Sequence, residues 1–596
     1  MPGAAASLRV TVGQYSAAGP KPENQDFHGL IVPDGMDLVT KGIACAIADG
    51  ISTSMRGAEA AETAVKSFLT DYYCTSEGWS ARRSGDAVIG ATNNWMHGQN
   101  ARIRPRDENF DRERAGLICT LSALVLKSRS AHIFHVGDSQ VARLTGKSLE
   151  PLTTPHRVEL GGGESYLGRA LGVNQIVEVE YRQVEVSRGD VFVLSTDGVH
   201  DFLGGAEIAA AIAEQPSLED AARKIVEQAL RKGADDNVTV QLVCVEDLPR
   251  GEVDDLLARE LRLPPPPTLR EGGELDGYRL LEVLHSGHRS HVWRVRHPDD
   301  ARDVVMKVPA TDHAGDPDAM AALMLEEWVL RRLAHPNLLA AAPQHGSRSA
   351  AYSLAAYQPG HTLHHMIAQS APLTLAETRA IVRQLSTGLE AMHRRGMLHR
   401  DLRPHNVIVD ENGHATIIDF GSVQVAGLDE VAPRAFEDAA YAGTLQFSAP
   451  ELYLGHAAGV QSDVFSLGVI AYRMLTGELP YGTRVSSANT PAAQRKLRYV
   501  AAAEHNPDVP DWVDAALAKA VAVDPQRRYE NPAELVQDLA NPNAALRLPQ
   551  KSGSGLSLQF WRAAALLLLT ALVLAIATRP DVWPSHQGPS QLQETE

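Results

Sequence analysis

Cysteine is scarce in this sequence: Cys45, Cys74, Cys119 and Cys244 are the only four among 596 residues, and no C-x-x-C pair occurs. This scarcity argues against a disulfide-stabilised secreted domain, and we expect reduced structural thiols. An excess of positive charge is also absent, because the formal net charge is −17. A nucleic-acid-binding surface is therefore not expected, whereas the acidic excess suits a protein that gathers divalent cations.

Long apolar runs are missing too, except for one near the C-terminus. The N-terminus has no basic stretch followed by an apolar one, so no signal peptide is expected. Ala563–Thr578 holds sixteen residues without a charge, between Arg562 and Arg579. Such a run gives about 24 Å of helix, against a hydrocarbon core of about 30 Å. The flanking arginines can reach the interface and tryptophans lie nearby, so we predict a transmembrane helix over 560–580. A buried helix is the alternative.

The basic residues around this run predict its orientation. Arg547, Lys551 and Arg562 precede or begin it, and Arg579 alone follows it closely. Positive charge is retained on the cytoplasmic side of membranes. The sequence therefore predicts a single-pass membrane protein whose large domains are cytoplasmic.

The rest of the chain divides into two large blocks, so an α+β multidomain protein is expected. Residues 8–247 alternate short β-rich runs with amphipathic helical ones, and residues 276–541 begin strand-rich and become helix-rich. Between them, residues 248–275 contain four consecutive prolines, which predict a semi-rigid spacer. A linker over 542–559 and a short polar tail over 581–596 flank the predicted transmembrane helix.

Aspartates in the first block follow a pattern typical of a metal site. Five of them stand at the end of a predicted strand or in the turn after it: Asp26, Asp49, Asp138, Asp197 and Asp236. Glycine or asparagine follows three of the five, which lets the backbone turn sharply toward a ligand. Hard ions such as Mg²⁺ and Mn²⁺ prefer oxygen ligands, and strand ends that converge can build a two-metal site.

The segments that carry these aspartates resemble the metal-dependent protein phosphatases of type 2C, in the same order along the chain. They are K-P-E-N-Q-D at 21–26, A-D-G at 48–50, V-G-D-S at 136–139, S-T-D-G at 195–198 and D-D-N-V-T-V at 235–240. The resemblance covers residues 8–246 and implies a β-sandwich flanked by helices. It also implies hydrolysis of phosphoserine and phosphothreonine by metal-activated water.

The resemblance assigns ligands for two or three Mg²⁺ or Mn²⁺ ions. These are Asp49 as the bridge, the Gly50 carbonyl, Asp197 and Asp236, with Asp26 directly or through water and Asp138 at a third, weaker ion. Lys21 would bind the substrate phosphate, where many relatives have arginine. Ile51 replaces a histidine of some relatives, and Gln140 replaces a common arginine. None of these departures removes an implied metal ligand, so phosphatase activity is expected.

The second block carries motifs for the opposite reaction. They are V-V-M-K at 304–307, Glu326 on the following predicted helix, H-R-D-L-R-P-H-N at 399–406, D-F-G at 419–421 and A-P-E at 449–451. Together they resemble the eukaryotic-like serine/threonine protein kinases over essentially all of 276–541. The resemblance implies a bilobal fold that binds ATP and Mg²⁺ in its cleft.

The resemblance also assigns roles to single residues of this block. They are Lys307 at the ATP phosphates with Glu326 as its partner, Asp401 as the base, Arg403 near the γ-phosphate, Asn406 and Asp419 at magnesium, and Gly287 and Val292 over the nucleotide. The glycine-rich loop departs from the family, because His285 and Ser290 stand where glycines are usual. Fewer glycines hinder the approach of backbone amides to phosphate, so weaker ATP binding is an open alternative.

The segment after Asp419 has few hydroxyl residues, while Arg400 calls for an anion. Glu430, Glu437 and Asp438 lie in this segment. One of these carboxylates could replace an activating phosphate, or the loop could simply be a solvated acidic surface.

The sequence thus predicts a membrane-anchored enzyme with two activities in signalling. It would phosphorylate protein serine and threonine with ATP and remove phosphate from the same residue types. One alternative is an active phosphatase with a kinase-like nucleotide-binding regulatory module. A second is a membrane scaffold for phosphoproteins. Substrates and oligomeric state do not follow from the sequence.

Overall fold

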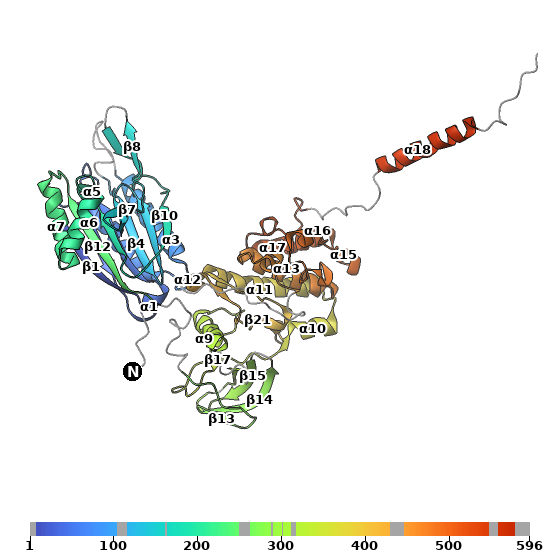
Figure 1. Cartoon of the computed structure of the whole chain (residues 1–596). Coiled ribbons are helices and arrows are strands. Elements are labelled where there is room, and N and C mark those ends of the chain that lie inside the picture. Colours follow the sequence, from blue (N-terminus) through green and yellow to red (C-terminus); the bar gives the residue numbers. More distant parts are fainter. Residues whose placement is uncertain are drawn as a thin grey trace, which may run out of the picture. The chain divides into compact units, whose positions relative to one another are not determined.

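The structure is a computed structural model of the whole chain (Figure 1). It describes residues 7–103, 116–160, 164–249, 263–287, 290–300, 302–310, 317–429, 446–546 and 558–578. The residues up to Leu546 form one compact unit and those from Arg547 onward form another.

Two five-stranded antiparallel sheets form the N-terminal part of the first unit. One sheet has the order β1 (Arg9–Ala17), β12 (Val238–Asp247), β11 (Val191–Ser195), β6 (Gln140–Thr145), β7 (Ser148–Pro151). The other has the order β10 (Glu180–Glu185), β5 (Ser130–Val136), β4 (Leu121–Lys127), β3 (Ile43–Asp49), β2 (Asp26–Ile31). Strands β3, β4 and β11 are buried along nearly their whole length, because both faces of each sheet are covered.

Helices cover the outer faces of this sandwich (Figure 1). α2 (Gly57–Cys74) and α3 (Ala81–Ala101) pack on the second sheet, and α6 (Gly205–Glu214) and α7 (Leu218–Arg231) on the first. A third apolar cluster, which includes Phe192, lies between the sheets. Shorter elements complete the fold: α1 (Gly35–Thr40), α5 (Asp197–His200) and a hairpin of β8 (Arg157–Leu160) and β9 (Glu164–Leu167). The predicted helix-flanked sandwich is therefore present.

A second sheet-and-helix lobe follows. Its strands have the order β13 (Glu274–Leu275), β14 (Tyr278–Ser286), β15 (Ser290–Arg296), β16 (Val304–Pro309), β17 (Ser353–Ala356), all antiparallel. Helix α9 (Pro317–Arg332) contacts β16 and β17. This packing places β16, which carries Lys307, next to α9.

The remaining lobe is mainly helical and completes the predicted bilobal fold. Its helices are α10 (Leu363–Ser370), α11 (Leu375–Arg394), α12 (Ala426–Asp429), α13 (Val460–Thr476), α14 (Pro491–Gln494), α15 (Ala502–His505), α16 (Asp511–Ala520) and α17 (Pro532–Ala540). Four 3₁₀ helices accompany them: η2 (Pro404–Asn406), η3 (Pro450–Leu454), η4 (Gly482–Arg484) and η5 (Pro525–Arg527). Two small sheets hold the catalytic segments: β18 (His361–Thr362), β20 (Val407–Val409) and β21 (Ala415–Ile417), and the pair β19 (Met397–Leu398) and β22 (Gln424–Val425).

The proline-rich stretch does not behave as a free spacer where it is described. The Pro264 carbonyl accepts a hydrogen bond from the Ala351 N–H at 2.9 Å. Leu263 and Leu269 pack against the apolar clusters of the two kinase-like lobes. Proline keeps its carbonyl as an acceptor, so an extended proline run can bind along a folded surface. At Leu263, Pro264 and Leu269 this stretch thus contacts the kinase-like lobes, and the spacer over 248–275 stays a prediction.

The described part of the second unit, residues 558–578, contains one helix, α18 (Leu558–Ala577), at the red end of the chain in Figure 1. Leu566 to Leu569 on this helix are between 65% and 73% exposed. Among the residues that the structure describes, no helix is sufficiently long and apolar to cross a membrane. The predicted transmembrane helix over 560–580 is thus not confirmed.

Candidate active sites

The five predicted aspartates of the sandwich converge at one end of its sheets. Asp26 begins β2 and lies directly opposite Asp49, the last residue of β3. The charges of the other members all raise the pKa of Asp49, which shows that the group acts as one electrostatic cluster. Its members are Asp26, Asp49, Asp138, Asp197 and Asp236.

Burial of this cluster strongly perturbs its protonation. Burial raises the pKa of Asp26 to about 6, despite hydrogen bonds from Thr239 at 2.7 Å and Thr196 at 2.9 Å. Burial and the charges of neighbouring carboxylates raise the pKa of Asp197 to about 7, and that of Asp49 well above its ordinary value. So many carboxylates cannot all remain ionised together without a compensating cation.

The cluster has the properties expected of a divalent-cation site. The buried oxygens Asp26 Oδ1 and Asp197 Oδ1 have no hydrogen-bond partner in the described part of the chain. Carboxylate oxygens without donors are the ligands that Mg²⁺ and Mn²⁺ take. The donor set therefore fits these ions.

Two basic side chains already contact the cluster. Lys21 Nζ lies 3.0 Å from Asp236 Oδ2. Arg157, on β8, donates from Nε to Asp138 Oδ2 at 2.9 Å and approaches Asp197 Oδ2 at 3.4 Å. The sequence prediction missed Arg157, because nothing in its local pattern marks it.

The glycines that follow the aspartates serve close packing rather than sharp turning. A Cβ on Gly50 would lie 2.3 Å from the Gly57 carbonyl carbon and oxygen, and one on Gly198 would lie 2.1 Å from the Asn237 oxygen. Neither Gly50 nor Gly198 has a positive φ. A side chain here would push apart the segments that carry the ligands, so glycine is needed for the site to close.

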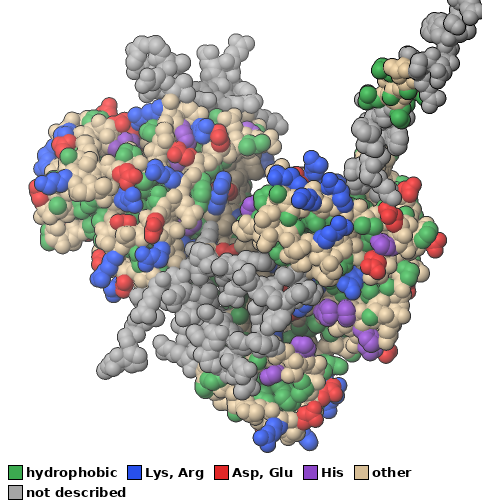
Figure 2. Space-filling view, turned by 45° about the vertical axis from the view of Figure 1, so that its right-hand side comes forward, with side chains coloured by type: hydrophobic (Ala, Val, Ile, Leu, Met, Phe, Trp, Pro, Cys, Tyr) green, Lys and Arg blue, Asp and Glu red, His purple; other side chains and the backbone are tan. Residues whose placement is uncertain are grey.

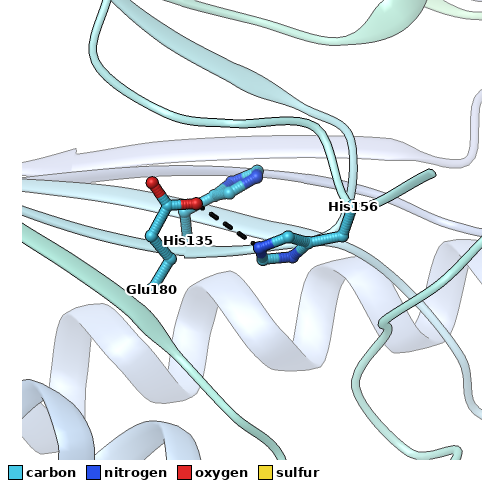
Figure 3. Close-up of side chains that lie close together, drawn as sticks. All are labelled: His135, His156 and Glu180. Carbon is cyan, nitrogen blue, oxygen red and sulfur yellow. Dashed lines mark ion pairs between the residues drawn. The ribbon is translucent and has the colours of Figure 1, made fainter.

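A further cluster beside this site consists of His135, His156 and Glu180 (Figure 3). His135 Nε2 lies 3.2 Å from the Thr154 carbonyl, an acceptor, so this nitrogen carries the proton. His156 Nδ1 accepts the Gly137 N–H at 3.1 Å, which leaves the proton on Nε2, facing Glu180 at 3.4 Å. Burial lowers the pKa of both rings, that of His135 to about 3, so both are neutral. Protonated nitrogens cannot ligate a metal; the cluster instead fixes the backbone before Asp138.

The kinase-like lobes bring together the predicted nucleotide residues. Lys307 Nζ lies 2.6 Å from Glu326 Oε2 and 3.4 Å from Asp419 Oδ1. Burial alone would raise the pKa of Asp419, but the Lys307 charge and the Gly421 N–H hold it at about 2. Val292 of β15 pairs directly with Lys307 of β16. Asp419 is therefore ionised and available to a magnesium ion.

The catalytic segment after β19 holds three further predicted residues. Asn406 Nδ2 donates to the Asp401 backbone oxygen at 2.9 Å and to its Oδ2 at 3.2 Å. Arg403 Nε lies 3.4 Å from the same Oδ2. These contacts fix the Asp401 carboxylate, which is what a base for an acceptor hydroxyl requires.

Asp463 holds the backbone of this segment through hydrogen bonds. Its carboxylate accepts the backbone N–H of His399 at 3.0 Å and that of Arg400 at 2.9 Å. Arg400 has φ +66, in the left-handed region that non-glycine residues rarely adopt. The two hydrogen bonds therefore hold a strained turn in place.

The glycine-rich loop is described only in part, because residues 288 and 289 lie outside the described chain. Gly287 N–H donates to the Ser290 carbonyl at 3.0 Å, and a Cβ on Gly287 would lie 2.9 Å from His285 Nε2. The substitution of His285 for a glycine thus places an imidazole against the one glycine that remains.

Histidines also lie beside the catalytic segment. His405 stacks on His364 of α10 at 3.9 Å, and burial and neighbouring positive groups lower the pKa of His405 to about 4. On the face drawn in Figure 2, several histidine side chains (purple) gather near one another. The sequence analysis gave these residues no role.

The sequence analysis suggested three acidic residues as the anion beside Arg400, and the structure does not describe them. Glu430, Glu437 and Asp438 lie outside the described residues. Burial lowers the pKa of Arg400, and the charges of Asp429 and Asp463 oppose this lowering. Asp429, at the end of α12, is therefore an anion for Arg400 that the sequence analysis missed.

Comparison with known proteins agrees with this geometry. Residues 15–243 match the family model described as protein phosphatase 2C, and residues 278–542 match that of the protein kinase domain. The chain thus carries a protein phosphatase 2C domain followed by a protein kinase domain, as the sequence motifs predicted.

Curated relatives match over the kinase domain. The serine/threonine-protein kinase PrkC of Bacillus subtilis is 27% identical over 289 residues, which are 47% of this chain and 43% of PrkC. The serine/threonine-protein kinase PknB of Mycolicibacterium smegmatis is 30% identical over 270 residues, 44% of this chain and 42% of PknB. The chain therefore spans less than half the length of these relatives.

Solved structures match each domain separately. The PknI kinase domain of Mycobacterium tuberculosis is 23% identical, covers 46% of this chain and 100% of its own, and has a TM-score of 0.36. PppA of Pseudomonas aeruginosa, titled a key regulatory component of T6SS, is 21% identical, covers 40% and 99%, and has a TM-score of 0.34.

Proposed function

We propose that the chain is a bifunctional enzyme that phosphorylates protein serine and threonine with ATP and dephosphorylates the same residue types. The observation that carries this proposal is the completeness of both residue sets. Five carboxylates converge in one domain, and the partly buried Lys307–Glu326 pair faces Asp419 in the other.

In the phosphatase domain, Asp49, the Gly50 carbonyl, Asp197 and Asp236 would hold two Mg²⁺ or Mn²⁺ ions. Asp26 would bind there directly or through water, and Asp138 would bind a third ion more weakly. These ions, when bound, would supply an acidified water as nucleophile and neutralise phosphate charge. Lys21, anchored 3.0 Å from Asp236, would bind the phosphate oxygens and orient the ester.

In the kinase domain, Lys307 would bind the ATP phosphates, while Glu326 keeps its ammonium in place. Asp401 would accept the proton of the substrate hydroxyl, and Arg403 would neutralise charge on the transferred phosphate. Asn406 and Asp419 would hold magnesium, and Gly287 and Val292 would cover the nucleotide.

One experiment tests both activities. Purified full-length protein is incubated with labelled ATP and Mg²⁺ or Mn²⁺, and compared with Lys307→Ala and Asp236→Asn. We expect Lys307→Ala to lose transfer to an added protein substrate, and Asp236→Asn to lose hydrolysis of phosphoserine and phosphothreonine peptides. Nucleotide binding without transfer in the wild type would favour the alternative of a kinase-like regulatory module. Loss of neither activity would contradict the site assignments.

Membrane attachment through 560–580 and a cytoplasmic location of both domains stay predictions. The exposed leucines of α18 support attachment to an apolar phase. The test is fractionation of cells that express the full chain or a chain that ends at residue 555. Recovery of both without detergent would refute attachment.

A further inference from the structure

A loop of the phosphatase domain, Ser76–Ser80, contacts the kinase domain directly. We call it the docking loop; it connects α2 to α3. Trp79 Nε1 donates to the Arg394 carbonyl at 2.8 Å, and the Gly78 carbonyl accepts the Gly427 N–H at 2.9 Å. The loop thus bonds to backbone at two places that are 33 residues apart in the kinase domain.

An ion pair joins the same loop to α9. Arg332, the last residue of that helix, places Nε and Nη2 at 3.0 Å and 2.8 Å from Glu77 Oε2. The Arg332 guanidinium also stacks on Trp328 at 3.9 Å. Arg332 thus donates two hydrogen bonds to one Glu77 oxygen while its guanidinium stacks on the Trp328 ring. This geometry fixes the ion pair more firmly than a single exposed contact would.

A buried lysine adds a third contact. Lys127, at the end of β4, has 0% exposure, and its Nζ donates to the Gly427 carbonyl at 2.6 Å. Burying an ammonium is costly without polar partners. Gly427 is therefore held through both its N–H and its carbonyl by the phosphatase domain.

Glycines permit this close approach. A Cβ on Gly78 would lie 2.3 Å from the Arg395 oxygen, and one on Gly396 would lie 2.6 Å from the Gly78 oxygen. A Cβ on Gly427 would lie 2.7 Å from the backbone oxygens of the docking loop. At all three glycines a side chain would collide with the other domain. Gly78 and Gly427 do not have a positive φ, so backbone conformation does not require glycine there and the close domain contact does. Apolar side chains extend the contact, since Met36 and Val39 of α1 pack against the kinase core.

The contacted kinase positions belong to three elements that lie next to predicted catalytic residues. Arg332 ends α9, which carries Glu326. Gly396 precedes β19 and the catalytic segment, and Gly427 lies in α12 after β22. β19 and β22 pair with each other, so their outer ends are held by one loop. α12 also ends in Asp429, whose charge acts on Arg400.

We propose that the phosphatase domain is a built-in activating partner of the kinase domain, which it holds in its active arrangement through the docking loop and Lys127. This regulation rests on the proposed kinase activity. It depends on the surface of the phosphatase domain and not on phosphate hydrolysis, since the docking loop contributes none of the metal ligands. The kinase would then work well only when the phosphatase domain is folded against it.

A charge exchange in full-length protein tests the proposal. Glu77→Arg and Arg332→Glu should each lower phosphate transfer to an added protein by about tenfold or more, because each places like charges together. The double variant should recover most of the rate. The matched control is Glu62→Arg, which makes the same charge change on α2 at its exposed pair with Lys66. Hydrolysis of p-nitrophenyl phosphate with Mn²⁺ should be unchanged in all four proteins.

Hydrogen exchange separates failure of this proposal from failure of the proposed function. The Gly427 amide bonds to Gly78, so peptides that cover Val425–Asp429 should exchange faster in Glu77→Arg and in Gly78→Leu, but not in Glu62→Arg. This readout needs no kinase activity. Unchanged exchange would show that the domains do not dock as described. Faster exchange with an unchanged or increased transfer rate would overturn the activating role. An inactive wild type that still shows the exchange differences would refute the proposed kinase function and leave the docking contact intact.

Discussion

Lys307 of β16 and Glu326 of α9 form a partly buried ion pair, with 2.6 Å between Nζ and Oε2. Burial alone would lower the pKa of Lys307, but the charges of Asp419 and Glu326 raise it above its ordinary value. Lys307 is therefore a positively charged side chain held between Glu326 and Asp419. Its position requires α9 to lie against the sheet, which links nucleotide chemistry to the placement of a helix.

Breaking this pair should impair phosphate transfer in a graded way. Lys307→Met should lower the rate by more than about 100-fold, because it removes the cation aimed at the phosphates. Glu326→Gln should lower it by about 10- to 100-fold, because the lysine keeps its charge but loses the partner that positions it. Labelled-ATP transfer to a protein substrate measures both. Arg331→Gln, a neutralised charge on the same helix, is the control, and an equal loss there would point to general damage of α9.

Metal activation of the phosphatase should weaken as pH falls. The pKa values of Asp26 and Asp197, about 6 and about 7, lie above the ordinary range, so these ligands take up protons as pH drops from 8 to 6. A protonated carboxyl does not ligate Mn²⁺, and binding must expel the proton. The Mn²⁺ concentration for half activation should rise by about tenfold per pH unit for each proton expelled.

The measurement is Mn²⁺ titration of hydrolysis and, independently, of binding heat at pH 8, 7 and 6. Asp49→Asn should abolish hydrolysis at every pH, because it removes the shared carboxylate charge. A half-activating concentration that does not change with pH would contradict the protonation of these ligands, as would substantial hydrolysis by Asp49→Asn.

The anion for Arg400 should be Asp429 rather than a phosphate. Asp429→Asn should lower transfer by about 5- to 20-fold, because Arg400 would keep its buried charge with less compensation. Ser422→Ala should leave the rate within about threefold, as a change that removes no charge from this region. The two variants are compared in the same transfer assay. Equal rates for Asp429→Asn and wild type would leave the carboxylates outside the described residues, Glu430, Glu437 and Asp438, as candidates.

Asp463 should stabilise the kinase domain in a pH-dependent way. Burial alone would raise its pKa, but the hydrogen bond from His393 at 2.7 Å and the bonds from the backbone hold the pKa below its ordinary value. Because the folded-state pKa is the lower one, this stabilisation is present above the ordinary carboxyl pKa of about 4 and is lost as pH falls below it. Asp463→Asn should cost about 2–4 kcal/mol of unfolding free energy at pH 7.

Urea unfolding at pH 7 and at about pH 3, below the ordinary carboxyl pKa, tests this point. The difference between wild type and Asp463→Asn should shrink at the lower pH. A difference of the same size at both values would mean that the charge of Asp463 does not matter.

The two activities should oppose each other on the same chain. A phosphate that the kinase places on its own chain meets a phosphatase site at high effective concentration. Wild-type protein with ATP and Mg²⁺ should therefore carry little phosphate. Asp236→Asn should accumulate it, and addition of Lys307→Ala should remove it again. Mass spectrometry of the intact proteins gives the count, and no gain in Asp236→Asn would mean that the sites do not act on a common phosphate.

The motifs of the sequence were sufficient to predict both domains, and many of the residues that they mark lie together in the structure, while the roles of these residues stay predictions. The predicted hydrolysis requires carboxylates such as Asp26 and Asp49, and the predicted phosphate transfer requires groups such as Lys307 and Asp419. Their residue types and their order along the chain can be read from the sequence alone. The helix-flanked sandwich and the bilobal fold followed from that resemblance. The sequence also determined that Ala563–Thr578 is a strongly apolar run of sixteen residues without a charge, although its role in a membrane is not confirmed.

Tertiary structure decided the contacts that no local pattern marks. Arg157 at the carboxylates, Asp429 near Arg400 and Glu77 against Arg332 are all ordinary surface-type charges in the sequence. Glu77 and Arg332 are 255 positions apart, and only the packing of two folded domains brings them together. The same holds for Pro264, whose carbonyl accepts a hydrogen bond from the Ala351 N–H of the kinase domain. A local pattern reports what each segment must be, whereas such pairings depend on the shapes of surfaces that exist only after folding.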